Sequence, residues 1–258
     1  MTGTPYADSY DIVDLAMYNQ ATTYMGHTPY GWGRYFNYPA NTGTGAPYYN
    51  PTTENSFFSS HSLRLVPIAR QEANIALDDY TTAYSDAQRN LTAVLQALGN
   101  NATTPFFAAN GEHYCSFALD CESTSGGELP MFTNYLHGWL EGMQTGVKDP
   151  NNNLLVGWSG VYSSQGYCTT WQSIVNCAAD FGIRPSWIWI ASGISQTALP
   201  AWDTTYTSTE VSCGIALGQS TDLWQYGENE PGSIDLDVGN PNIDFHTALG
   251  QYCPIPNP

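Results

Sequence analysis

The stretch that decides the fold is Phe117-Ala118-Leu119-Asp120-Cys121-Glu122, which ends an apolar run with two acids one residue apart. Successive side chains of a strand point to opposite faces, so Asp120 and Glu122 share one face with small residues, and bulky apolar residues share the other. The bulky face is suited to packing against helices outside a barrel, and the acidic face to its interior. We therefore expect a strand at Tyr114–Cys121 whose two acids lie at the C-terminal mouth of a barrel.

The rest of the chain alternates between strand-like and helix-like segments. Apolar residues three and four positions apart predict helices at Asp79–Leu98, Leu129–Met143 and Thr169–Phe181. Apolar runs bounded by glycine, proline and polar residues predict strands at Asp11–Met17, Trp32–Phe36, Leu63–Ala69, Tyr114–Cys121, Leu154–Tyr162, Ser186–Ala191, Ser212–Leu217 and Asp222–Tyr226. Strands that alternate with helices are typical of parallel βαβ units. The sequence therefore predicts an α/β fold, an irregular (β/α)₈ TIM-type barrel, as a single domain over residues 1–258 with a core at about 11–240 and a C-terminal tail at 241–258.

The charge of the chain excludes whole classes of partner. Six Lys and Arg against 23 Asp and Glu give a net charge of −17. Proteins bind nucleic acid through clusters of Lys and Arg, so we expect no nucleic-acid partner. No run of 18 apolar residues is present, so we also expect no membrane span.

Cysteine usage and sequons favour an extracellular location. Six cysteines without Cys-x-x-Cys spacing predict at least two disulfides, with Cys213–Cys253 as the expected pair. Cys115 and Cys121 are not expected to bond to each other, because six strand residues separate them by about 20 Å. The triplets that begin at Asn90 and Asn101 fit the glycosylation sequon.

Further acids are candidates to converge on the same mouth. Asp14 is placed near the end of the first predicted strand, and Asp235 and Asp237 follow the last one. Two neighbouring carboxyls raise one pKa, so a proton donor can coexist with a carboxylate, as the cleavage of a glycosidic bond requires. The structural alternatives are that Asp120 caps a helix, that Glu122 pairs with an arginine, and that the other acids are solvated at loop edges.

Arginine and aromatic residues near strand ends suggest how such a site is completed. We expect Arg34 to point into the barrel and to pair with an interior acid, the alternative being an outward side chain over a helix. Loops at Asn37–Asn55 and Ser192–Val211 are candidates to wall a glycan cleft or simply to pack on their neighbours. Their aromatic residues are Tyr38, Tyr48, Tyr49, Trp202 and Tyr206.

Competing chemistries lack their motifs. Gly157-Trp158-Ser159-Gly160-Val161 misses the last glycine of a nucleophile elbow. No phosphate-binding loop, dinucleotide fingerprint or His-Glu-x-x-His pair is present. The segment from Asp235 to Asn240 is an incomplete calcium loop. We therefore expect no cofactor and no metal.

Short motifs in order along the chain resemble two related families. They are Gly33-Arg34-Tyr35-Phe36, Leu65-Val66-Pro67-Ile68, Phe117-Ala118-Leu119-Asp120-Cys121-Glu122, Gly160-Val161-Tyr162-Ser163, Trp187-Ile188-Trp189-Ile190-Ala191 and Trp224-Gln225-Tyr226 before Ile234-Asp235-Leu236. The set resembles the glycoside-hydrolase-like domain of unknown function 1906 and, more distantly, glycoside hydrolase family 25, the lysozyme-like muramidases. The third predicted strand departs from the muramidase pattern, which favours the uncharacterised family.

The resemblance implies roles for individual residues. Glu122 is the implied general acid and Asp120 its partner, with Asp14 and Asp235 as the other catalytic acids. The substrate-binding residues that we predict beside these acids are Arg34, Glu72, Tyr162, Trp224, Gln225 and Tyr226. The resulting hypothesis is a secreted glycoside hydrolase that cleaves an amino-sugar polymer such as peptidoglycan by carboxylate acid catalysis. The alternative is a non-catalytic glycan-binding or self-associating extracellular protein on the same barrel fold.

Overall fold

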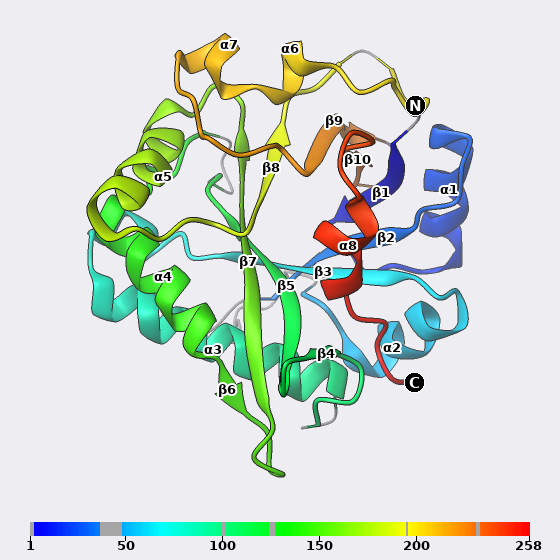
Figure 1. Cartoon of the computed structure of the whole chain (residues 1–258). Helices are drawn as coiled ribbons and strands as arrows, with labels where there is room; N and C mark the ends of the chain where they lie inside the picture. Colours follow the sequence, from blue (N-terminus) through cyan, green and yellow to red (C-terminus); the bar gives the residue numbers. More distant parts are fainter. Residues whose placement is uncertain (1–2, 37–47, 100–101, 124–126, 195, 231–232) are drawn as a thin grey trace.

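The computed structural model describes residues 3–36, 48–99, 102–123, 127–194, 196–230 and 233–258 (Figure 1). Eight strands form a closed barrel in the order β1-β2-β3-β5-β7-β8-β9-β10, and β10 closes the ring by pairing with β1. The strands are β1 (Thr4–Ser9), β2 (Gly31–Tyr35), β3 (Arg64–Arg70), β5 (Glu112–Asp120), β7 (Leu154–Ser164), β8 (Trp187–Ala191), β9 (Leu223–Glu230) and β10 (Ile234–Gly239). Short β4 (Phe107–Ala109) and β6 (Val147–Lys148) extend β5 and β7.

The barrel is irregular at its closure, as the sequence predicts. Neighbouring barrel strands are parallel except that β10 runs antiparallel to both β9 and β1. The β8–β9 connection carries two helices of only four and five residues in place of a long one. The fold is nevertheless the expected α/β, TIM-type barrel with helices around it (Figure 1).

Helices cover the outside of the barrel. The longer ones are α1 (Leu15–Met25), α2 (Pro51–Ser60), α3 (Tyr80–Gly99), α4 (Thr133–Thr145) and α5 (Cys168–Phe181). The short ones are η1 (Ile75–Leu77), α6 (Thr204–Thr207), α7 (Thr209–Cys213), α8 (Phe245–Ala248) and η2 (Gly250–Tyr252). Helices α3 and α4 lie very close together because α4 contributes Gly138, where an added Cβ would lie 2.2 Å from the Tyr80 carbonyl oxygen.

Strand alternation divides the apolar residues into two cores. One lies between the strands and the helices and includes Phe117 and Leu119 of β5, as the sequence predicts. The other fills the barrel and includes Ala118 of the same strand with Trp187 and Trp189 of β8. The same alternation places Asp120 in the interior.

The C-terminal segment is part of this structure and closes the base of the barrel. Leu249 and Cys253 belong to the interior core. Arg64, at the start of β3, donates hydrogen bonds to the carbonyl oxygens of Gly250 and Cys253 at 2.8 and 2.9 Å. The residues expected to form a tail therefore pack under the barrel.

Two predicted strands are wrong. Asp11–Met17 contains the start of helix α1, and Asp14 caps that helix by accepting a hydrogen bond from the Met17 amide at 2.9 Å. Ser212–Leu217 contains the end of α7 and the turn after it. The true first strand begins at Thr4, so the predicted core boundary at residue 11 is also wrong.

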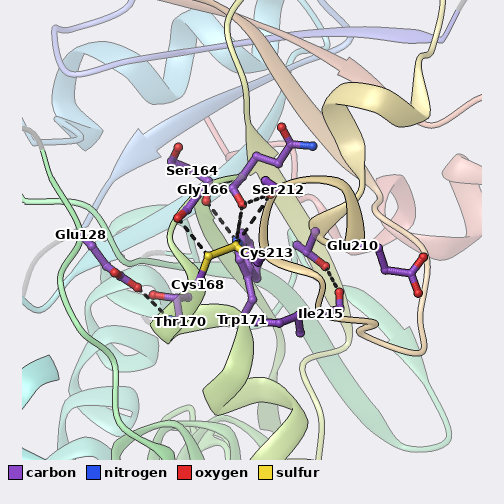
Figure 2. Close-up of a disulfide and its surroundings, with 12 residues drawn as sticks. Glu128, Ser164, Gly166, Cys168, Thr170, Trp171, Glu210, Ser212, Cys213 and Ile215 are labelled. Atoms are coloured by element: carbon purple, nitrogen blue, oxygen red, sulfur yellow. Dashed lines mark hydrogen bonds between the residues drawn. A yellow bond between two sulfur atoms is a disulfide. The ribbon is translucent and has the colours of Figure 1, made fainter.

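The disulfide prediction is wrong in number and in pairing. Cys168 at the start of α5 is bonded to Cys213 at the end of α7 (Figure 2). The other four cysteines are free and buried, so Cys115 and Cys121 are indeed not bonded to each other. Of the two predicted sequons, the one at Asn90 is buried in α3, where the Asn90 side chain donates to the Asp86 carbonyl oxygen at 2.9 Å. Asn101 of the other lies outside the described residues. Among the residues described, no helix has the length and apolarity needed to span a membrane.

A buried ion pair joins the barrel to the helix layer. Arg34 points outward from β2, and its guanidinium donates to both Glu54 oxygens of α2 at 2.7 and 3.2 Å. Both side chains are 0% exposed. Arg34 also donates to the carbonyl oxygen of Ser9, and Glu54 accepts from the amide of Val13. Arg34 is paired with a carboxylate, but that carboxylate belongs to α2, so the predicted pairing with an interior acid and the predicted place inside the barrel are both wrong.

We predict that Glu54→Gln lowers the free energy of unfolding by about 3–5 kcal/mol, because it leaves the buried Arg34 charge unpaired. Urea denaturation measures the change. Asp180→Asn, which neutralises an exposed acid of α5, serves as the control and should shift stability by no more than about 0.5 kcal/mol. A Glu54→Gln protein as stable as this control would contradict a structural role for the pair.

Candidate active site

Asp120 occupies the centre of the mouth at the end of β5. Its side chain is fully buried and accepts hydrogen bonds from Arg70 Nε at 2.8 Å and Tyr35 Oη at 3.0 Å. Its other oxygen accepts from the Glu122 amide at 2.8 Å. Burial raises the pKa of Asp120, and the Arg70 guanidinium opposes this effect. With only donors around it, Asp120 is suited to remain a carboxylate.

Glu122 lies two residues further on, directly after β5, and its side chain is half-buried. Burial raises the pKa of Glu122 to about 7, with the negative charges of Asp120 and Glu228 adding to the effect. A carboxyl with such a pKa is protonated in about half of the molecules at neutral pH. The prediction that the two acids differ in protonation therefore has a physical basis in this geometry.

A hydrogen-bond chain runs from Glu122 across the barrel. Tyr162 Oη lies 2.6 Å from Gln225 Oε1 and 3.3 Å from Glu122 Oε2. A phenol has one hydrogen, and the shorter contact directs it to Gln225. A lone pair of Tyr162 is then available to accept a hydrogen bond from protonated Glu122. Gln225 Nε2 continues the chain to Asp8 Oδ2 at 3.5 Å.

A second group of acids comes from the β1–β10 pair. Asp8 faces Asp235 in the antiparallel register, and Asp237 lies one step deeper. Burial strongly raises the pKa of Asp8, and the charge of Asp237 raises it further. The pKa of Asp237 is also strongly raised by burial, and this residue accepts a hydrogen bond from Trp189 Nε1 at 2.9 Å. Each of these two buried carboxyls therefore holds its proton to a higher pH than a solvated aspartate does.

The structure brings five of the predicted site residues together at the mouth of the barrel. They are Asp120, Glu122, Tyr162, Gln225 and Asp235. Asp14 is not among them, because it is exposed at the helix cap, and Asp8 of β1 takes the interior position foreseen for it. Arg34 lies in the helix layer, and Glu72 is exposed in the loop after β3.

Trp224 and Tyr226 do not line the mouth. Gln225 points inward, so strand alternation turns both neighbours outward, where they are 1% and 0% exposed. Trp224 stacks on Tyr206 with ring centroids 5.6 Å apart, and Tyr226 donates to the Thr197 carbonyl oxygen. Their placement in a substrate cleft is therefore wrong.

Partly exposed tyrosines lie near the mouth instead. Tyr10 contacts both Tyr35 and Tyr48 edge to face, at centroid distances of 5.6 and 6.3 Å. Tyr48 comes from one of the two predicted loops, whereas Tyr49 of that loop is buried against Phe36. Tyr38 lies outside the described residues.

Sequence reasoning missed Asp8 and Arg70. Alternation gave a usable signal for Arg70, because Val66, Ile68 and Arg70 share a face of β3. Asp8 was missed because the strand Thr4–Ser9 contains proline and has few bulky residues. No group of three His, Cys, Asp or Glu is arranged to hold a metal within the described part of the chain.

No family model and no curated protein matches the sequence. Solved structures share the fold at low identity. A structure of an uncharacterised B. stearothermophilus protein is similar with a TM-score of 0.65 at 12% identity, covering 94% of this chain and 99% of that one. A structure of GHIP, a virulence factor and glycosyl hydrolase 25 of Streptococcus pneumoniae that participates in host cell invasion, has a TM-score of 0.51 at 11% identity. The match covers 97% of this chain and 92% of that chain. The chain thus has a fold like that of a glycosyl hydrolase 25.

We predict that Asp120→Asn lowers the pKa of Glu122 below its value of about 7, because it removes a neighbouring negative charge. Carbon-13 NMR of the Glu122 carboxyl measures the titration. Glu228→Gln should lower the same pKa by less, since Asp120 contributes more to the shift. An unchanged or higher pKa in Asp120→Asn would rule out this electrostatic coupling.

The raised pKa of Glu122 also predicts how stability depends on pH. An unfolded glutamate ionises near 4.5, and the folded one near 7, so folding becomes less favourable as pH rises between these values. Glu122→Gln cannot ionise, and its stability relative to the parent should therefore increase from pH 4 to pH 8. Thermal unfolding at the two pH values tests this sign, and an equal difference at both would contradict it.

Proposed function

We propose that this protein is a secreted glycoside hydrolase that cleaves an amino-sugar polymer such as peptidoglycan, with Glu122 as the general acid. The observation that carries the proposal is the half-buried Glu122 beside the buried Asp120, with a pKa of about 7 on the first. Hydrolysis of a glycosidic bond requires a protonated acid and a carboxylate in one site, and we assign these two parts to Glu122 and Asp235. The fold likeness to a glycosyl hydrolase 25 adds support.

In the first step, Glu122 donates its proton to the glycosidic oxygen while the bond to the anomeric carbon breaks. The electron pair of that bond stays with the leaving oxygen, and positive charge develops on the remaining sugar. Asp235 is only half-buried and lies on the strand pair that carries Asp8 and Asp237. It is the carboxylate that we assign to stabilising this charge. Water then adds to the sugar, and its proton returns to Glu122.

Asp120 acts as a positioning residue in this scheme. It is fully buried in its ion pair with Arg70, so it is not free to contact a sugar, but it accepts a hydrogen bond from the Glu122 amide and its charge adds to the effect of burial in raising the pKa of Glu122. Asp8, on the true first strand β1, takes the place among the site acids that the sequence predicted for Asp14. Tyr162, which is held by Gln225, accepts a hydrogen bond from protonated Glu122 and so orients the Glu122 proton.

Secretion and a weakly charged substrate fit the composition. The Cys168–Cys213 disulfide is the kind of bond that persists outside the cytosol. A net charge of −17 provides no attraction to a strongly anionic polymer, which favours neutral amino-sugar chains.

A second candidate function is non-catalytic glycan binding on the same barrel. The observation that favours it is that the interior acids Asp120 and Asp237 accept hydrogen bonds from donors of the protein itself, Arg70 and Trp189. Such satisfied acids would also serve to hold a barrel together without turnover.

We predict that Glu122→Gln lowers turnover by about 10²–10⁴-fold while the protein stays folded, since general acid catalysis has this magnitude. The measurement is release of reducing ends from a panel of purified glycans that includes peptidoglycan and N-acetylglucosamine oligomers. In the parent, kcat/KM should fall as pH rises through about 7, because the acid loses its proton.

Glu228→Gln is the matched control, because Glu228 is an exposed acid near Glu122. It should keep most of the parental turnover. Full activity in Glu122→Gln would remove this residue from the mechanism. Binding without turnover by the parent on every glycan would favour the second candidate.

A further inference from the structure

A separate pocket of about 440 Å³ lies on the flank of the barrel. Its walls come from α6, α7, the turn at 214–221 and the residues just after β10. None of the mouth acids or their hydrogen-bond partners lines it. We call it the flank pocket.

The flank pocket exists because the β8–β9 connection lacks a long barrel helix. The short α6 and α7 leave the outer face of β9 covered by aromatic side chains instead. Tyr206 stacks on Trp224, and Trp202 contacts the edge of the same ring at a centroid distance of 6.2 Å. Trp202 is half-buried and is the aromatic residue of the pocket lining.

The buried polar side chains of the pocket are fixed by hydrogen bonds to the backbone. The hydroxyls of Thr209 and Thr221 donate to the carbonyl oxygens of Ile215 and Thr207 at 2.6 and 2.7 Å. Asn240 Nδ2 donates to the Thr221 carbonyl oxygen at 2.7 Å. These bonds join α6, α7, the turn and the end of β10, so the pocket has its shape before any ligand arrives.

The disulfide anchors the same wall. Cys213 ends α7 and is bonded to Cys168 of α5, and Glu210 of α7 points away from that bond (Figure 2). Helix α7 is too short to be stable alone. The covalent bond therefore helps to hold Glu210 in place at the pocket.

The lining has the chemistry of a site for neutral, hydroxyl-rich ligands. It contains six Ser or Thr hydroxyls, three carboxamides, one carboxylate and one indole, and no Lys, Arg or His among its described residues. Glu210, Ser220 and Asn242 are exposed, and within the described part of the chain their side chains make no hydrogen bond. Arg184 lies against Gly218 and donates to the carbonyl oxygen of the lining residue Leu217, but no cation is part of the described lining itself, so a phosphate or carboxylate ligand would meet Glu210 without a lining cation. A purely apolar ligand would leave these polar groups unpaired.

We propose that the flank pocket binds a neutral saccharide unit of a glycan chain. Sugar hydroxyls would donate to Glu210 and exchange hydrogen bonds with Ser220 and Asn242, and an apolar sugar face would pack on Trp202. The volume falls in the range of small-molecule sites, about 300–1,000 Å³. This site does not depend on the proposed catalysis, because a barrel without turnover would retain it.

The test uses the Glu122→Gln protein, so that turnover does not consume the probe. The probes are the N-acetylglucosamine tetramer and, as an anionic counterpart, glucose 6-phosphate. We expect the tetramer to shift the NMR signals of the Trp202 indole and the Gln219 and Asn242 carboxamides, and glucose 6-phosphate to leave them unchanged.

Glu210→Gln combined with Asn242→Ala should weaken tetramer binding at these signals by at least about tenfold. Asp180→Asn, an exposed acid of α5, should leave the affinity unchanged. Absent shifts at the three pocket residues, or equal affinity in the double variant and the parent, would overturn the proposal. If the parent cleaves no glycan but the shifts occur, the hydrolase proposal fails while the flank pocket stands.

Discussion

The ion pair between Arg70 and Asp120 is the interaction on which the interior of this barrel depends. A carboxylate at the centre of an apolar barrel is costly unless a cation and several donors surround it. Arg70 provides the cation from β3, and Tyr35 provides a further donor from β2. Because Asp120 also accepts from the Glu122 amide, the same pair fixes the backbone from which Glu122 extends. The three neighbouring strands β2, β3 and β5 are thus joined next to Glu122, the proposed general acid.

This constraint also explains why two acids one residue apart behave differently. The charge of Asp120 is compensated by a direct ion pair with Arg70, whereas Glu122 lies beside a tyrosine hydroxyl and other acids, and Arg70 lowers its pKa less than burial and those acids raise it. Arg70 acts on Asp120 through a direct ion pair and on Glu122 only through a weaker attraction, so it opposes the effect of burial on the pKa more strongly at the first acid than at the second. The sequence spacing alone places both on one face, but only the three-dimensional neighbours decide which of them holds the proton.

Whether the sequence predicts a strand correctly depends on how apolar the faces of that strand are. β5, β7 and β8 each contain a long run rich in apolar residues, so the sequence predicts all three strands, and alternation along β5 gives the inward direction of Asp120. β1 and β10 were missed, since their inner faces carry Asp8 and Asp237 and therefore lack a strong apolar pattern. Arg34 and Trp224 were misplaced because alternation was not applied to β2 and β9. Their partners, Glu54 and Tyr206, come from segments that no local pattern connects to those strands.

The antiparallel last strand determines where the ends of the described chain lie. β10 runs from the mouth towards the base, and the segment after it packs under the barrel, where Pro254 accepts a hydrogen bond from the Leu65 amide at 2.9 Å. β1 starts at the same base, with Thr4 beside Gly239. A tag, linker or further domain joined to either end would therefore emerge on the side opposite the acids. Immobilisation through either end would leave the mouth facing the solution, and a long glycan could approach it without passing the attachment point.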